Sequence, residues 1–321
     1  MKIHNINDLT IEELCGQLLC LEMTGYKNIS QMKAAIKKNR PGGIYVYGFK
    51  EEVIKELTEY ANKICKYPIL VVTDAEFGPG SPFPEEPEMP APMAWGAADN
   101  AELIEKVGEC TGKIIRKKGV HLALAPVTDI NMNFHNPLVN VRSVSDSPNQ
   151  VLKIMSAYMR GMQKEGRLLA TVKHFPGDGV DDRNQHFCAT INRLPKKEWM
   201  DSFGKVYKGM IKDGVSAFMV AHIALPSWDE DNIDPILGPM PATLSYELMT
   251  NLLKKKLGFK GCLISDAMSM IGSVSLVPIN ELAPKFIAAG GDFVLFPEKN
   301  DLQNLLAAYN QGKLSKERIV L

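Results

Sequence analysis

Eight short runs of apolar and β-branched residues alternate with longer amphipathic stretches along this chain of 321 residues. The sequence predicts strands at residues 17–23, 43–47, 69–73, 122–126, 169–173, 217–221, 262–265 and 293–296. It predicts helices between them, at residues 51–66, 101–118, 149–165, 196–213, 246–257 and 279–289. Eight strands that alternate with helices are the pattern of a closed parallel barrel. The predicted fold class is therefore α/β, a TIM-type (β/α)8 barrel of a single domain.

Polar residues stand where many of these strands end. They include Asp74, Asp129, His174, His222 and Asp266. A buried strand gains nothing from a charged end unless that end faces a solvated site. In a parallel barrel the carboxyl ends of all strands meet at one face, where active sites lie. The sequence therefore predicts that these side chains converge on one site.

The charge balance argues against a polyanionic partner. Lys plus Arg and Asp plus Glu number 37 each, so the formal net charge is +0. Without an excess of either sign, no overall field favours nucleic acid or an anionic membrane surface. We expect a small neutral substrate, and the sequence does not predict an oligomeric state.

The N-terminal segment and the cysteines bear on location and on cofactors. Residues 1–8 lack the apolar core of an export signal, and no apolar run approaches the length of a membrane span. The six cysteines are scattered, and none forms a Cys-x-x-Cys pair. There is no Gly-rich phosphate loop and no dinucleotide fingerprint. We expect a cytoplasmic protein with neither metal nor cofactor, although a chain trimmed of its export signal would look the same.

Several segments, in order along the chain, carry a resemblance to a known family. The main ones are Lys-His-Phe-Pro-Gly-Asp-Gly at 173–179 and Leu-Ile-Ser-Asp-Ala-Met at 263–268, together with residues 42–44, 74–78, 125–130, 136–137, 141–143, 219–222, 241–245 and 257–261. The chain resembles the catalytic barrel of family 3 glycoside hydrolases, in particular their β-N-acetylhexosaminidase branch. The resemblance implies that residues 1–321 form such a barrel. This barrel is either the whole protein or the N-terminal domain of a longer one, with its last helix truncated.

Asp266 is the predicted nucleophile. Retaining glycosidases need a carboxylate beneath the anomeric carbon, where it forms a covalent glycosyl-enzyme intermediate. An Asp that follows a barrel strand is placed for this role. A Ser-Asp pair also commonly begins a helix, so a capping role is the alternative.

His186 is the predicted acid/base, because the resemblance implies a His on the loop after residues 173–179. An imidazole can donate and then accept a proton near neutral pH. The family's loop reads Asp-x-His, whereas this chain has Asn184-Gln185-His186. Asp181 or Asp182 is then a candidate for the missing carboxylate. The alternative is that His186 is a surface residue without a role.

Four further residues are predicted to bind substrate: Asp74, Arg142, Lys173 and His174. The resemblance implies that Lys173 and His174 bind the hydroxyls of the sugar in the first subsite. A lining that combines a carboxylate with cations suits a neutral polyol, which both donates and accepts hydrogen bonds. Without the motif context, Asp74 and Arg142 would be read as solvated loop charges.

The resemblance leaves three functions open. The leading one is a retaining hydrolase that releases terminal N-acetyl-β-glucosamine. The second is a β-glucosidase or a glycoside phosphorylase of the same family. The third is a sugar-binding protein with a decayed site, which Asn184 and the altered loop after Asp74 would fit. A preserved Asp266 argues against decay.

Overall fold

The computed structural model describes residues 5–320, so residues 1–4, where an export signal was sought, lie outside it. Its main sheet has eight strands: β1 (Leu19–Glu22), β2 (Gly43–Tyr45), β3 (Leu70–Thr73), β4 (Leu122–Ala123), β5 (Leu169–Phe175), β7 (Ala217–Val220), β11 (Cys262–Ser265) and β12 (Val294–Leu295). They lie in the order β11-β7-β5-β4-β3-β2-β1-β12, and each neighbouring pair is parallel. A parallel bridge between Ile264 and Phe293 brings the two ends of this series together. The predicted barrel is confirmed.

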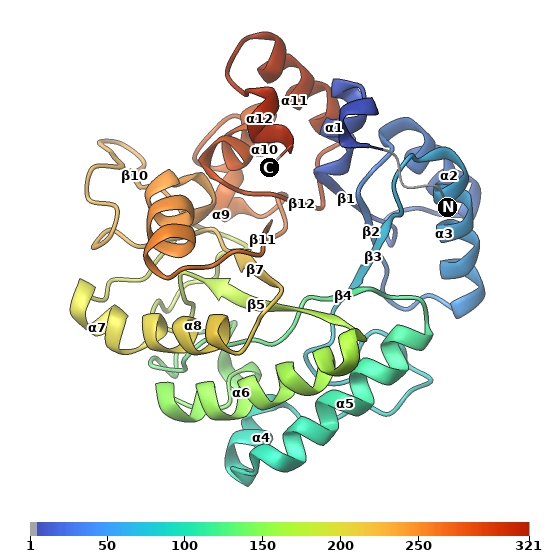
Figure 1. Ribbon diagram of the computed structural model, residues 1–321. Coiled ribbons are helices and arrows are strands. Elements are labelled where there is room, and N and C mark those ends of the chain that lie inside the picture. Colours follow the sequence, from blue (N-terminus) through green and yellow to red (C-terminus); the bar gives the residue numbers. More distant parts are fainter. Residues whose placement is uncertain (1–4, 321) are drawn as a thin grey trace.

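Helices form an outer ring around the strands (Figure 1). They are α1 (Ile11–Gln17), α2 (Ile29–Asn39), α3 (Glu51–Ile64), α4 (Pro92–Ala98), α5 (Ala101–Lys117), α6 (Pro148–Gln163), α7 (Lys196–Asp201), α8 (Phe203–Lys212), α9 (Ile271–Val274), α10 (Ile279–Ala289), α11 (Asp301–Asn310) and α12 (Lys316–Val320). Helix α5 begins where the Asn100 side chain accepts a hydrogen bond from the Leu103 N–H. Helices α5 and α6 lie side by side, and a Cβ at Gly161 would be 2.2 Å from the Glu105 carbonyl oxygen. Glycine therefore permits the close approach of these two helices.

The barrel interior is filled by side chains rather than open. Successive residues of a strand point to opposite faces, so Val71 packs outward against the helices and Val72 packs inward. The inward cluster consists of Cys20, Tyr45, Val72, Leu122, Leu124, Ala217, Met219, Ile264, Phe293 and Leu295. Because the interior is packed, a ligand can enter only at the carboxyl ends of the strands, as in other barrels of this type.

The structure departs from the predicted elements in several places; for example, the strand predicted at 17–23 begins only at Leu19, because Gln17 ends α1. The predicted helix 196–213 is two helices, which break at Ser202, where φ is −110° and ψ is −94°. The predicted helix 246–257 is a π-helix at Glu247–Lys256. Two small two-stranded sheets were not predicted: β6 (Thr190–Ile191) with β8 (Ile223–Ala224), and β9 (Ile233–Asp234) with β10 (Gly238–Pro239).

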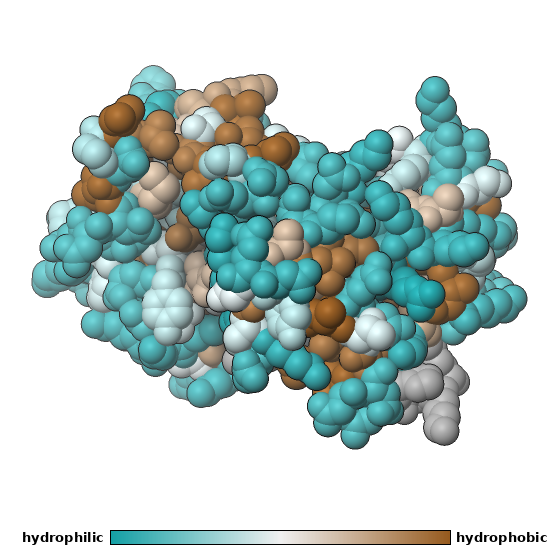
Figure 2. Space-filling view, turned by 90° about the horizontal axis from the view of Figure 1, so that it is seen from above, coloured by the Kyte–Doolittle hydropathy of each residue, from teal (hydrophilic) through white to brown (hydrophobic). Residues whose placement is uncertain are grey.

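The face of the molecule in Figure 2 is largely hydrophilic. Figure 2 shows the side that carries α10, α11 and α12, where apolar residues gather in separate patches. Among residues 5–320, no helix is long and apolar enough to cross a membrane. All six cysteines are free, and Cys15, Cys20 and Cys65 are buried.

Candidate active site

A cavity of about 200 Å³ opens at the carboxyl ends of the strands. It is small beside the roughly 300–1,000 Å³ of pockets for drug-sized ligands, so its size suits a single sugar ring. All six predicted site residues line it: Asp74, Arg142, Lys173, His174, His186 and Asp266. The structure brings these six side chains together, and their individual roles stay predictions.

A bulge in β5 explains how two adjacent residues reach the same cavity. Val172 pairs with Phe218 of β7, but the next paired residues are Phe175 and Val220. Between these two pairs, β5 advances by three residues and β7 by two, so β5 holds one extra residue. A bulge of this kind changes the direction of side chains that would otherwise alternate between faces. Lys173 and His174 therefore both line the cavity.

Two cations, the buried Lys173 and the half-buried Arg142, form the floor of the cavity with two carboxylates. Lys173 Nζ lies 2.9 Å from Asp74 Oδ1 and 2.5 Å from Glu76 Oε1. Arg142 donates to both Glu76 oxygens at 2.8 Å, and Tyr45 Oη donates to Asp74 Oδ2 at 2.7 Å. Burial alone would raise the pKa of Glu76, but the charges of Lys173 and Arg142 hold it well below its usual range. This network fixes the cations in place, ready to donate hydrogen bonds.

Glu76 was not among the residues predicted to bind substrate, although it lies within residues 74–78, one of the segments that resemble family 3. Glu76 is the shared partner of Lys173 and Arg142. Its position two residues after Asp74, in a loop that follows a strand, was the one available signal. Sequence alone does not show that its side chain lies between the two cations.

His174 is held by the buried carboxylate of Asp129, which in turn contacts Asp178. Its Nδ1–H donates to Asp129 Oδ2 at 2.6 Å, and its Nε2 lies 3.4 Å from Arg142 Nη2. Asp129 Oδ1 also accepts from the backbone N–H of Asp178 at 2.8 Å. Asp178 Oδ1 accepts from Asn136 Nδ2 and from the Gly179 N–H, both at 2.7 Å. This network orients the imidazole ring of His174, which was predicted to bind sugar.

Asp178 gives the fold a pH-dependent component. Burial, together with the nearby Asp129 carboxylate, raises the pKa of Asp178 to about 6. A carboxyl group whose folded pKa is raised contributes stability below its unfolded pKa of about 4, and loses it as the pH rises through about 6. We expect Asp178→Asn to raise the melting temperature at about pH 8 and to change it little at about pH 4. Thermal unfolding followed across this range checks the prediction, and a shift of equal size at both ends would contradict it.

Asp266, the predicted nucleophile, follows β11 directly and lines the cavity. Burial raises its pKa, but His174, the Ala267 N–H and Lys173 together hold the pKa below its ordinary value. The Ala267 N–H donates to Asp266 Oδ1 at 2.8 Å, and the Asp266 N–H donates to the Val220 carbonyl at 2.8 Å. The side chain is therefore an anion at neutral pH, as a nucleophile must be.

His222 supports the segment that carries Asp266. It is buried, and burial lowers its pKa, so the ring is neutral. Its Nε2–H donates to the Ala267 carbonyl at 2.9 Å, and its Nδ1 accepts from Thr243 Oγ1 at 3.0 Å. His222 is absent from the cavity lining. Like Asp129, His222 was predicted to converge on the site, and it lies behind the cavity lining rather than in it.

His186 lies on the loop of residues 178–191, which follows β5 and includes the short strand β6. Its side chain is exposed, and its Nδ1–H donates to Asn184 Oδ1 at 2.8 Å. This bond leaves Nε2 as the ring nitrogen that can exchange a proton with substrate. Asn184 thus orients the ring as a carboxylate would, without supplying a negative charge.

The carboxylate of Asp181 does not replace the missing one. It is buried and accepts hydrogen bonds from Arg183 and from the Ile191 N–H at 2.7 Å. These bonds join residues near the two ends of the loop, and they do not reach the imidazole ring of His186. Asp182 is exposed, and His186 Nδ1 is already bonded to Asn184. The hypothesis that Asp181 supplies the charge is wrong.

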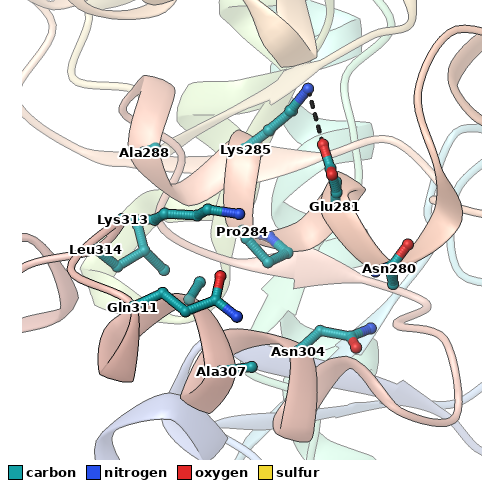
Figure 3. Close-up of a pocket in the computed structure, with 11 residues that line it drawn as sticks. Asn280, Glu281, Pro284, Lys285, Ala288, Asn304, Ala307, Gln311, Lys313 and Leu314 are labelled. Atoms are coloured by element: carbon teal, nitrogen blue, oxygen red, sulfur yellow. Dashed lines mark ion pairs between the residues drawn. The ribbon is translucent and has the colours of Figure 1, made fainter.

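A second pocket lies between α10 and α11, away from the barrel mouth (Figure 3). Its volume is about 290 Å³, and Lys285 pairs there with Glu281 at 3.0 Å. None of the six predicted site residues lines it. The predicted site residues therefore all lie at the barrel mouth and none at this second pocket. Among residues 5–320, no group of three or more His, Cys, Asp or Glu side chains could hold a metal ion.

Comparison with known families decides the classification. The profile described as "Glycosyl hydrolase family 3 N terminal domain" matches residues 10–320. The chain belongs to glycoside hydrolase family 3. This confirms the resemblance to family 3 that the sequence motifs carried.

Relatives within family 3 are named for several different activities. The chain is 31% identical to a "Beta-N-acetylglucosaminidase/beta-glucosidase" of Cellulomonas fimi, over 96% of this chain and 55% of that protein. It is 28% identical to a "Beta-hexosaminidase" of Vibrio cholerae, over 88% of this chain and 83% of that protein. The structure of a "Beta-glucoside phosphorylase BglX bound to 2FGlc" matches with a TM-score of 0.90 and 33% identity, over 98% of this chain and 57% of that one. The chain thus spans little more than half the length of the first and the third of these.

Proposed function

We propose that this chain is a retaining β-glycosidase that releases terminal N-acetyl-β-glucosamine. The observation that carries the proposal is that Asp266, His186 and the four sugar-binding candidates line one small cavity. An anionic carboxylate and an imidazole with a free Nε2 are the two groups that a retaining mechanism needs. The names of the Cellulomonas fimi and Vibrio cholerae relatives support this substrate class.

In the first step, His186 Nε2–H gives its proton to the glycosidic oxygen while an Asp266 oxygen attacks the anomeric carbon. The bond between that carbon and the leaving oxygen breaks, and a glycosyl ester forms on Asp266. In the second step, water attacks the same carbon and gives a proton back to Nε2. The ester bond breaks, and Asp266 returns to its anionic form.

The floor of the cavity would hold the sugar. Lys173 and Arg142 donate hydrogen bonds to hydroxyl oxygens, and Asp74 accepts hydrogen bonds from hydroxyl groups. A neutral sugar suits this floor because Asp74 and Glu76 already balance the two cations. We also expect the protein to be cytoplasmic, as the free cysteines suggest.

The direct test is hydrolysis of 4-nitrophenyl N-acetyl-β-glucosaminide, with the β-glucoside in parallel. We expect release of nitrophenol from the first substrate. Release from the glucoside alone would change the proposal to a β-glucosidase. If neither substrate is cleaved, a sugar-binding protein without catalytic activity becomes the better description.

Phosphorolysis is a second candidate that a specific observation favours. His186 bonds to the neutral Asn184, so the acid/base pair carries no negative charge to repel phosphate. One structural relative is named a β-glucoside phosphorylase. Phosphate added to the same assay tests this candidate, because phosphate in place of water would accelerate turnover and give a sugar phosphate.

Asn184→Asp separates the two outcomes further. If phosphate accelerates the wild-type enzyme, we expect this variant to lose most of the acceleration, because a carboxylate beside His186 repels the incoming anion. Hydrolysis without phosphate should continue. Rates measured with and without phosphate check this, and equal acceleration in both proteins would contradict it.

A further inference from the structure

Gln185 differs from its neighbours on the loop of residues 178–191. Its side chain is 2% exposed, whereas the flanking His186 is exposed and Phe187 is 76% exposed. A long polar side chain is buried at a loop tip only where it has hydrogen-bond partners. The partners of Gln185 lie on two other loops of the barrel mouth.

Three hydrogen bonds fasten the tip of the loop to His222, in the connection after β7, and to the start of α9, in the connection after β11. Gln185 Oε1 accepts from the backbone N–H of His222 at 3.0 Å. The Gln185 carbonyl accepts from the Gly272 N–H at 3.0 Å, and the His186 carbonyl accepts from the Ile271 N–H at 3.2 Å. Of these three bonds, the one to His222 is the one that a side chain provides.

Gly272 provides the surface on which the tip rests. A Cβ at this position would lie 2.8 Å from the Gln185 carbonyl oxygen and 3.1 Å from His222 Cβ. The first distance is shorter than real side-chain carbons show, and that contact is with backbone; the second distance is tighter than most such contacts. The absence of a side chain at Gly272 therefore allows the loop to dock at this depth.

This contact joins the segments that carry the two predicted catalytic groups. His222, to which Gln185 bonds, donates from Nε2 to the carbonyl of Ala267, the residue after Asp266. The base of the loop is fixed elsewhere, through Asn136 Nδ2, which donates to Asp178 Oδ1 and to the Asp181 carbonyl. These contacts at the base do not reach the tip. The position of His186 relative to Asp266 therefore depends on the contact at the tip.

We propose that Gln185 is a positioning residue that holds the acid/base loop closed, so that His186 meets the leaving-group oxygen. This rests on the proposed function, because it assigns a purpose to the distance between His186 and Asp266. A misplaced acid slows cleavage only where the leaving group needs a proton. This dependence separates a positioning role from a general effect on folding.

The test uses two substrates that carry the same sugar, the one that the wild-type enzyme cleaves, and that differ in their leaving group. An alkyl β-glycoside needs protonation of its leaving group, and a 2,4-dinitrophenyl β-glycoside does not. We expect Gln185→Leu to lower kcat/KM for the alkyl glycoside about tenfold or more, which is part of the ~10²–10⁴-fold that acid/base catalysis supplies. The dinitrophenyl glycoside should change by less than about threefold. Gly272→Ala disturbs the same contact from the other side and should give the same pattern.

Gln163→Leu is the matched control. Gln163 Oε1 also accepts a backbone N–H, that of Ala170 at 3.1 Å, near the start of β5 and far from the cavity. This variant should leave both substrates unchanged. An active wild type whose Gln185→Leu and Gly272→Ala variants slow both substrates equally, or slow neither, would overturn the positioning role and leave the glycosidase standing. A wild type that cleaves neither substrate would overturn the proposed function itself.

Discussion

Replacement of Asp266 by asparagine is expected to lower kcat/KM by about 10⁴-fold or more, because it removes the group that forms the covalent intermediate. The amide has nearly the same shape and can still accept from the Ala267 N–H, so the loop after β11 should keep its conformation. Rates with the 4-nitrophenyl substrate measure the loss. Residual activity above about one per cent of wild type would show that another group is the nucleophile.

Asp292→Asn is the matched control for this substitution. Asp292 is also a paired carboxylate, bonded to Lys254 and to the backbone N–H of Leu263. It precedes β12 and lies at the other end of β11 from Asp266. We expect the control to lose stability while it keeps its kcat/KM. Equal loss of activity in both variants would point to a folding defect rather than to chemistry.

His186→Ala is expected to slow cleavage of alkyl glycosides by about 10²–10⁴-fold, the usual contribution of a positioned acid/base group. The dinitrophenyl glycoside should form its intermediate at nearly the wild-type rate, because its leaving group departs without a proton. Azide should then restore turnover of this substrate, since an anionic nucleophile needs no general base in the second step. A series of leaving groups of different basicity measures the effect.

His135→Ala serves as the comparison for His186. His135 is another exposed loop histidine, stacked on Phe134, and it is absent from the cavity lining. Its removal should leave the dependence on leaving group unchanged. If the two variants behaved alike, His186 would be a surface residue, which was the alternative that the sequence left open.

The barrel could be predicted because each strand is an apolar run closed by polar residues. The strand predicted at 262–265 has the same bounds in the structure, Cys262–Ser265. The break at Ser202 could not be predicted, because the apolar pattern continues through it and both Trp199 and Phe203 are buried. The periodicity of apolar residues indicates which side of a segment is buried, but it does not indicate whether the backbone changes direction within that segment.

The sequence could indicate which residues lie at the barrel mouth, but not the hydrogen bonds and ion pairs that link them. A polar residue at the end of a strand has an assigned direction in a parallel barrel, and for this reason Asp266 and His174 could be placed at one mouth. Glu76 and Gln185 lie on loops, where position along the chain does not fix direction. Their roles follow from contacts with Lys173, Arg142 and His222, which are remote in sequence.

Identification of the labelled residue in a trapped intermediate tests the central claim most directly. The wild-type protein would be incubated with a 2,4-dinitrophenyl 5-fluoro-β-glycoside, in which the fluorine slows breakdown of the glycosyl ester, and then digested and examined by mass spectrometry. The account predicts one sugar bound through an ester to Asp266, and no label in Asp266→Asn. A sugar found on any other residue, or turnover of the reagent by Asp266→Asn at the wild-type rate, would contradict it.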